Sequence, residues 1–533
     1  MRSPFKSSAL IFPLALIATS WGEPSLSAEV QERQGDKGTR GQGGEKPLAT
    51  GKTRYIASLP LATSFFQSKI QNPKSKIPTI ASIRVRFLDR RGLPTRGRTR
   101  PFIITREFDL QPGDVYNQKL AQQGLQRVSD LNSIRRASIT LQPTIDPKRV
   151  VMVVNVVERS PVTASFDTGA PAPSALQGPF QPQPVSPGAD IDSGFSVGGS
   201  AQLRNLGGNN QNLVVRVTGG EQVLNGELSF TDPWIAGDRH RTGYTVNIFN
   251  QRAVQSVFTG GDRDINLPGG DDPWVHRLGG GVQFFRPLAP NLTAALGLSY
   301  QRVSVRDDMF GSKLQPRDEL NNRLTFSDSG QDDLLTLNFS AQLDRRNDKD
   351  NPTRGSRLLF GIDQSIPVGE ANILFTRLSA NYLQYIPLPL FGFTKGPRTL
   401  ILNLQTGTML GDVPGYEAFN LGAGLTRGFS GNAIGTGRSF VEATAEYHFP
   451  ISIFQLFDQP VNLGGALFVD YTSDLNTASS VLGDPAIVRD KPGSGLGYGV
   501  GLRAETSLGS AWLEFAWSEQ GESQVIFTLG DRF

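Results

Sequence analysis

The feature that most constrains this chain is an alternation of apolar and polar side chains, repeated in segments of about ten residues. Clear examples are 335–344, 441–449 and 525–530, and clusters of Gly, Pro, Asp and Asn separate the segments. Successive side chains of a strand point to opposite faces, so each segment is predicted to be a strand with one apolar face. Strands in lipid must pair all their backbone groups, so they must close into a ring. We therefore expect residues 161–533 to form a transmembrane β-barrel of about 16 antiparallel strands.

A soluble β-sandwich would also alternate, but other features argue against it. Residues 1–28 have the organisation of a secretory signal peptide, with basic Arg2 and Lys6, an apolar run, and a cleavage point at Ser27-Ala28. The chain has no cysteine, which excludes disulfides, thiolate metal sites and cysteine nucleophiles. Phe, Tyr and Trp border the outward faces of the predicted strands. No run of 18 apolar residues follows the signal, so no membrane helix is expected.

The lengths of the predicted connections alternate as well. Several connections after odd-numbered strands are long, namely 169–193, 253–275, 306–332 and 411–436, whereas those after even-numbered strands are mostly short. Outer-membrane barrels combine short periplasmic turns with longer external loops. An even number of strands also places the first and the last residue of the barrel on the same side of the membrane. The four long connections are therefore expected to be external loops.

The residues before the barrel divide into a basic arm and a small domain. Residues 29–100 contain 16 Lys and Arg against 5 Asp and Glu, a net charge of +11. Residues 29–79 are rich in Gly, Lys and Gln and bury too little apolar surface to fold, so we expect a basic disordered linker. The alternative is contact of this arm with anionic lipid or a cell-wall polymer.

Residues 80–160 are predicted to form one compact α+β domain, with a helix over 116–131 and strands over 137–141 and 150–157. The step Gly113-Asp114-x-Tyr116-Asn117 before the helix resembles POTRA domains, the periplasmic modules that bind polypeptides. The resemblance implies a POTRA domain that binds extended chains by strand addition at a sheet edge. Only one such domain fits before the barrel.

The barrel contains the most specific motif, Leu425-Thr426-Arg427-Gly428-Phe429, between the predicted eleventh and twelfth strands. It resembles the (V/I)RG(F/Y) motif of the outer-membrane assembly and polypeptide-transport superfamily. Members include BamA, TamA, the two-partner-secretion transporters and the chloroplast envelope import channel. The resemblance covers residues 80–533 and implies that the sixth external loop folds into the lumen, with Arg427, Gly428 and Phe429 as part of its lumen anchor.

In the superfamily this arginine pairs with inward acids on the next two strands. Glu446 matches the first acid, and Asp470 matches the second, in a segment where Thr472 stands at a position usually occupied by glycine. Alternation alone also places Glu446 and Asp470 on the lumen face. The alternative for Arg427 is an ordinary exposed loop arginine, because a guanidinium buried between carboxylates is costly unless both bonds form.

The C-terminal segment alternates and ends on an aromatic residue. Phe527, Leu529 and Phe533 resemble the β-signal that is recognised during outer-membrane insertion. A plain final strand is the alternative, and the two interpretations are compatible.

These resemblances imply an outer-membrane polypeptide translocase or barrel-protein insertase, in a bacterial-type outer membrane with its POTRA domain in the periplasm. The expected partners are the lipid bilayer, unfolded polypeptide clients, and periplasmic chaperones or assembly machinery, with no nucleic acid. A two-partner-type exporter of one client and a passive pore are the alternatives. The chain has three histidines and no catalytic constellation, so neither an enzyme nor a cofactor or metal is expected.

Overall fold

The structure is a computed structural model that describes residues 78–168, 196–349, 351–429, 431, 433–456, 459–506 and 509–529. The expected signal peptide (1–28) and nearly all of the expected linker (29–79) lie outside the described residues, as do the connection 169–193 and Phe533. The described chain forms a small three-stranded sheet with helices, followed by a sixteen-stranded sheet.

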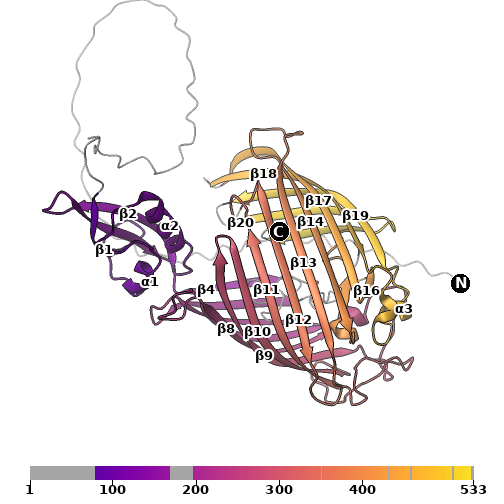
Figure 1. The fold of residues 1–533 in the computed structure, drawn as a ribbon. Helices are drawn as coiled ribbons and strands as arrows, with labels where there is room; N and C mark the ends of the chain where they lie inside the picture. The colour runs from indigo at the N-terminus through magenta and orange to yellow at the C-terminus, as the bar shows by residue number, and fades with distance from the viewer. Residues whose placement is uncertain are drawn as a thin grey trace, which may run out of the picture. The chain divides into compact units, whose positions relative to one another are not determined.

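The small domain, expected to be a POTRA domain, is a three-stranded sheet with helices packed against it (Figure 1). Strand β3 lies in the centre of the sheet, parallel to β1 and antiparallel to β2. Ile80, Ile104, Val128 and Met152 are fully buried in its core. The elements are β1 (Thr79–Leu88), α1 (Pro101–Thr105), α2 (Gln118–Ser129), β2 (Ile134–Pro143) and β3 (Arg149–Glu158).

The helix predicted over 116–131 is observed as α2, two residues shorter at each end. Asn117 sets its start, because the Asn117 side chain accepts hydrogen bonds from the backbone N–H groups of Lys119 and Leu120 at 2.9 and 3.2 Å. Helix α1 was not predicted, because five residues are too few to show a helical period.

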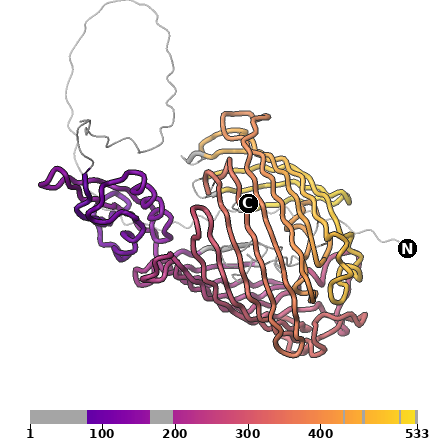
Figure 2. The backbone as a smooth tube through the Cα atoms, in the orientation of Figure 1, coloured from indigo at the N-terminus to yellow at the C-terminus, as the bar shows by residue number. Residues whose placement is uncertain are grey.

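The second sheet confirms the prediction of a sixteen-stranded antiparallel barrel. Each strand pairs with its neighbours in sequence, and β4 and β21 are the two ends of the strand order. The strands lie side by side and curve around a lumen (Figures 1 and 2). They are β4 (Val162–Thr168), β5 (Ser196–Leu206), β6 (Gln211–Gly220), β7 (Val223–Asp232), β8 (Gly243–Val254), β9 (Trp274–Ala289), β10 (Leu292–Arg306), β11 (Gln331–Asp344), β12 (Gly355–Ile366), β13 (Phe375–Pro387), β14 (Thr399–Gly411), β17 (Ser439–Leu456), β18 (Gln459–Ser473), β19 (Ser494–Thr506), β20 (Gly509–Ser518) and β21 (Ser523–Leu529).

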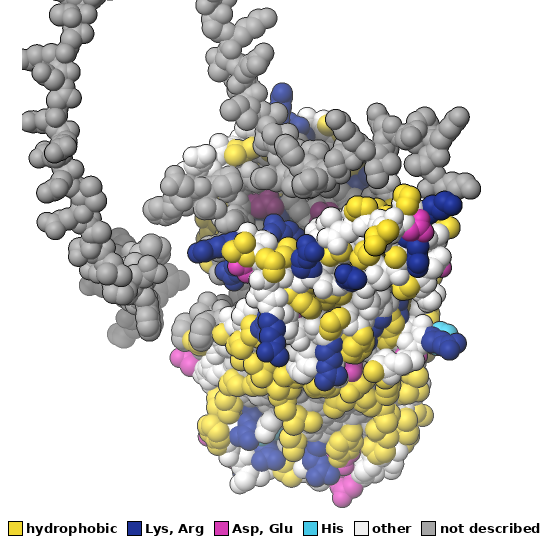
Figure 3. Space-filling view, turned by 90° about the vertical axis from the view of Figure 1, so that its left-hand side faces the viewer, with side chains coloured by type: hydrophobic (Ala, Val, Ile, Leu, Met, Phe, Trp, Pro, Cys, Tyr) yellow, Lys and Arg dark blue, Asp and Glu magenta, His cyan; other side chains and the backbone are white. Residues whose placement is uncertain are grey.

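Alternation along the strands separates an outward apolar face from an inward polar face. On β11, Leu337 and Phe339 are exposed on the outside, whereas their neighbour Ser340 is fully buried. Hydrophobic side chains form broad patches on the face shown in Figure 3, interrupted by Lys and Arg. This is the pattern of strands that face lipid on one side and a lumen on the other. None of the helices in the described part of the chain combines the length and hydropathy needed to cross a bilayer.

The connections at the two ends of the barrel differ in length. We call the end reached by β14 at Gly411 the loop end, because the long connections gather there. Short elements interrupt three of these connections: η1 (Ser256–Phe258) follows β8; η2 (Gly415–Glu417), β15 (Phe419–Leu421) and β16 (Gly435–Gly437) follow β14; η3 (Ala478–Ser480) and α3 (Pro485–Val488) follow β18. The connection 412–438, loop six below, is the one that contains the predicted motif.

The long connections pack together into an apolar cluster, which we call the loop cap. Phe258, Leu324, Phe429 and Val481 belong to four different connections and are all buried within it. Loop six contributes further members, and strand residues near the loop end, such as Phe440, complete the cluster. The loop cap is the largest apolar cluster among the described residues. It accounts for a core that a hollow barrel alone does not supply.

Candidate functional site

Loop six brings Arg427 to the residues that the motif predicted as its partners. The Arg427 Nε and Nη2 atoms donate to the two carboxylate oxygens of Asp470 at 2.7 and 2.9 Å. The Nη1 atom lies 2.8 Å from Oε2 of Glu446. Arg427 is 1% exposed, although it belongs to a loop. Two strands therefore hold this arginine, β18 through Asp470 and β17 through Glu446.

A third carboxylate completes the site and was not predicted. Nη1 of Arg427 donates to Oε1 of Glu514, on β20, at 2.6 Å. The Phe468 ring lies against the guanidinium, with 3.3 Å between its centroid and Cζ of Arg427. Glu514 is a lone acid between outward Leu513 and Phe515. The inward register of Glu514 on the fifteenth strand is the sequence signal that points to the lumen. The superfamily motif predicts acids only on the twelfth and thirteenth strands, so it does not include Glu514.

The residues beside Arg427 bring loop six into close contact with the inner face of the barrel. Gly428 has a φ of 97°, a left-handed conformation that favours glycine, and its Cα faces the backbone of Trp517 on β20. Phe429 is fully buried in the loop cap. Thr472, where glycine is usual, accepts a 2.7 Å hydrogen bond from the Thr426 hydroxyl. The threonine therefore adds a bond at this position rather than blocking the approach of the loop.

The residues of the predicted insertion signal are only partly described. Phe527 lies on β21 with 67% of its surface exposed, on the outward face. Leu529 pairs with Ala511 of β20, and Phe533 lies outside the described residues. Phe527 therefore has the position of an outward residue on the final strand.

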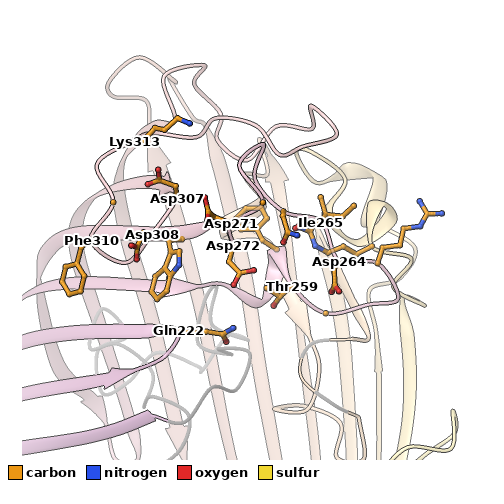
Figure 4. A pocket seen from close by; sticks show the side chains of 18 of the residues that line it. Gln222, Thr259, Asp264, Ile265, Asp271, Asp272, Asp307, Asp308, Phe310 and Lys313 are labelled. Carbon is orange, nitrogen blue, oxygen red and sulfur yellow. The ribbon is translucent and has the colours of Figure 1, made fainter. Parts of the chain in front are cut away.

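Two cavities lie in the lumen and at the loop end of the barrel. One, of about 220 Å³, lies in the lumen, and Arg427, Glu446, His448 and Glu514 line part of it. The other, of about 1100 Å³, lies among the connections at the loop end, where Figure 4 shows carboxylates that include Asp271 and Asp307. Despite these acids, no group of three or more His, Cys, Asp or Glu side chains in the described residues is placed to hold a metal ion.

Comparison with known proteins identifies the family. The model of the Omp85 superfamily domain matches residues 205–533. This chain belongs to the Omp85 superfamily. Among its relatives, the chloroplastic outer envelope protein 80 of Oryza sativa subsp. japonica is 31% identical over 85% of this chain and 63% of its own length. The chloroplastic protein TOC75 of Pisum sativum is 25% identical over 85% of this chain and 56% of its own length.

Solved structures with low sequence identity to this chain share its fold. BamA from Haemophilus ducreyi lacking POTRA domains 1-3 superposes with a TM-score of 0.56 at 17% identity, over 85% of this chain and 84% of that one. CdiB from Escherichia coli superposes with a TM-score of 0.54 at 12% identity. This Omp85 protein is therefore a transmembrane barrel preceded by a POTRA domain. Omp85 proteins related to it are found in outer membranes, including the chloroplast envelope. The chain spans only 63% and 56% of the two chloroplast relatives named above.

Proposed function

We propose that this Omp85 protein is an outer-membrane polypeptide translocase or barrel-protein insertase whose POTRA domain captures unfolded clients by strand addition. Membership of the superfamily supports the general function. Among the described residues of the POTRA sheet, β2 pairs on one side only, with β3, so its other edge can accept an extended chain. The proposed setting is a bacterial-type outer membrane with the POTRA domain in the periplasm, and the proposed partners include periplasmic chaperones or assembly machinery.

One observation favours insertion over the two alternatives: the loop cap occupies one end of the lumen, while the strand order is open between its two end strands. Within the described residues, no backbone pairing joins β4 to β21. A client that enters the lumen therefore meets the packed apolar side chains of the loop cap ahead of it. At its side it meets the gap between β4 and β21, which we call the seam. A seam of unpaired strand edges can template a new strand. An exporter or a passive pore needs a route through the loop end instead.

The proposal is tested by locking the seam. The chain has no native cysteine, so cysteine pairs introduced on β4 and β21 report only on the intended bond. We expect a locked seam to abolish insertion of a barrel client into liposomes, and a reducing agent to restore it. The matched control places the same pair on β11 and β12, which are already joined along their length.

The alternatives give different results in the same preparation. An exporter keeps transporting its client with the seam locked, and a passive pore conducts ions without crosslinking any client to the POTRA domain. A locked seam that leaves client insertion at the parent rate contradicts the lateral route.

A further inference from the structure

The early part of loop six, before Arg427, is also held by buried ion pairs, which the sequence analysis did not anticipate. Glu417 lies at the end of η2, and its Oε1 atom accepts from Nη1 of Arg277 on β9 at 2.6 Å. Its Oε2 atom accepts from Nη2 of Arg377 on β13, also at 2.6 Å. Glu417 is 3% exposed, and the two arginines are 6% and 7% exposed. Each carboxylate oxygen therefore has its own cationic donor.

Backbone and hydroxyl contacts reinforce the same place. The carbonyl oxygen of Tyr416 accepts from Nη2 of Arg277 at 2.5 Å, and that of Glu417 accepts from Nη2 of Arg377 at 2.8 Å. The Tyr416 hydroxyl donates to Asp332 of β11 at 2.5 Å. Three strands, β9, β11 and β13, thus hold two consecutive loop residues.

The two held points of loop six have opposite polarity and attach to different parts of the wall. At Arg427 the loop is the cation and the strands β17, β18 and β20 supply carboxylates. At Glu417 the loop is the anion and β9 and β13 supply guanidinium groups. The segment between them contributes Phe419 and Leu425 to the loop cap. Loop six is therefore held by ion pairs at two points, Glu417 and Arg427, and the segment between them forms part of the loop cap.

We propose that Glu417 is a second anchor of loop six, a positioning residue that holds the loop cap closed over the lumen. The inference deepens the proposed function, because lateral release depends on a closed loop end. The charge of Glu417, and not its shape alone, holds the loop, because both carboxylate oxygens face arginines in a water-poor site. Loss of the Glu417 charge removes the counter-ion that Arg277 and Arg377 share, and Asp363, 3.8 Å from Nη1 of Arg377, compensates only part of the remaining charge. Contact of these arginines with water then becomes favourable, and loop six is expected to move away from the strands.

The test is Glu417→Gln, which keeps the size of the side chain and removes its charge. The reporter is Val481→Cys, a buried loop-cap residue on a different connection, in a chain without other cysteines. With folded protein in liposomes, we expect a membrane-impermeant maleimide to label the reporter at least about tenfold faster when Glu417 is replaced. Single-channel recordings should show larger or longer openings for the same variant.

The matched control is Glu227→Gln, which removes a carboxylate from the pair between Glu227 on β7 and Arg216 on β6, two strands other than those that hold Glu417 and Arg427. It should label at the parent rate. Glu417→Asp, which keeps the charge, should restore part of the protection, whereas an effect of packing alone would not follow charge. If Glu417→Gln labels like the parent or like the control, the anchor does not exist.

A second variant covers poor folding. If Glu417→Gln gives no heat-modifiable barrel, Arg377→Gln keeps the pair with Arg277 and is expected to label at an intermediate rate; parent-like labelling overturns the proposal. Maleimide labelling reports on the loop cap and not on the client. A negative labelling result therefore does not bear on client insertion through the seam. Conversely, failure of the seam experiment leaves the labelling result unchanged.

Discussion

At the scale of single residues, the Arg427 site shows why a buried charge persists in this fold. The guanidinium of Arg427 faces the carboxylates of Asp470, Glu446 and Glu514 and lies on the Phe468 ring. Desolvating such a group is costly, and the cost is offset only when the geometry of the ion pairs is good. The planar fork of arginine meets this condition, because Nε and Nη2 reach both oxygens of one carboxylate. The site therefore depends on the shape of the guanidinium as well as on its charge.

We predict that Arg427→Ala lowers the free energy of unfolding by about 3–5 kcal/mol, since it leaves buried carboxylates without a counter-ion. Arg427→Lys should recover only part of this loss, because an ammonium cannot bond bidentately. Urea titration followed by heat-modifiable mobility measures both. Arg263→Ala, which breaks the exposed pair with Asp490, is the control and should change stability by less than about 1 kcal/mol. An unchanged midpoint for Arg427→Ala would argue against the lumen anchor.

Glu514 provides a finer test of the same site. We predict that Glu514→Gln destabilises the barrel by less than Arg427→Ala, because Asp470 and Glu446 still compensate the guanidinium. A double-mutant cycle of these two substitutions should show coupling of about 0.5–3 kcal/mol, as expected for groups in contact. Additive effects in the urea titration would mean that the 2.6 Å contact between Arg427 and Glu514 does not contribute to the free energy of unfolding.

The POTRA domain contains a residue that should make its stability depend on pH. Burial raises the pKa of Glu107 from 4.5 to about 7, and nearby Arg241, Arg106 and Arg127 oppose this rise. Between those two values the folded domain retains a proton that the unfolded chain releases, so stability falls as pH rises through this window. We predict that proteolysis in urea cuts the domain more readily at pH 8 than at pH 5.5. Glu107→Gln should remove the difference; the same pH dependence in this variant would refute the assignment.

At the scale of elements, strand β11 illustrates how alternation assigns each residue to lipid or to the lumen. Phe339 points outward and is exposed, whereas Gln342 lies in the inward register. We predict that Phe339→Arg destabilises the barrel by about 2–4 kcal/mol, the range for a cation near the middle of the bilayer. Gln342→Arg is the matched control and should be tolerated, because the lumen is polar. The folded fraction in lipid measures both, and equal effects would contradict the assignment of faces.

At the scale of the whole molecule, the POTRA domain and the barrel have separate cores and should have separable roles. We predict that deletion of residues 80–158 leaves a barrel that still inserts, since every strand of the large sheet lies outside the deletion. Client binding should be lost, because the open edge of β2 is removed. Crosslinking of an unfolded client to the two forms makes the comparison. Full client binding by the barrel alone would show that capture occurs elsewhere.

Much of this architecture follows from sequence because it depends on local periodicity. A strand has a period of two, so the faces of β11, β17 and β18, and with them the inward positions of Glu446 and Asp470, can be assigned without a structure. Connection lengths and strand parity, which need only counting, likewise separate the two ends of the barrel. Periodicity alone does not say which residue pairs with Glu446 and Asp470. The resemblance of the Arg427 motif to the superfamily predicts that pairing.

Tertiary structure alone decided which distant groups meet inside the lumen. Alternation says that Glu514, Arg277 and Arg377 face inward, but it does not say which loop residue reaches them. That depends on the curvature of the sixteen-stranded sheet and on how loop six packs into the loop cap, both of which are non-local. Glu417 is the clearest case: in sequence it is one acid in a loop, and only the approach of β9 and β13 turns it into the centre of two buried ion pairs. Local periodicity determines the face on which a residue lies, whereas the curvature of the barrel and the path of loop six determine its partner.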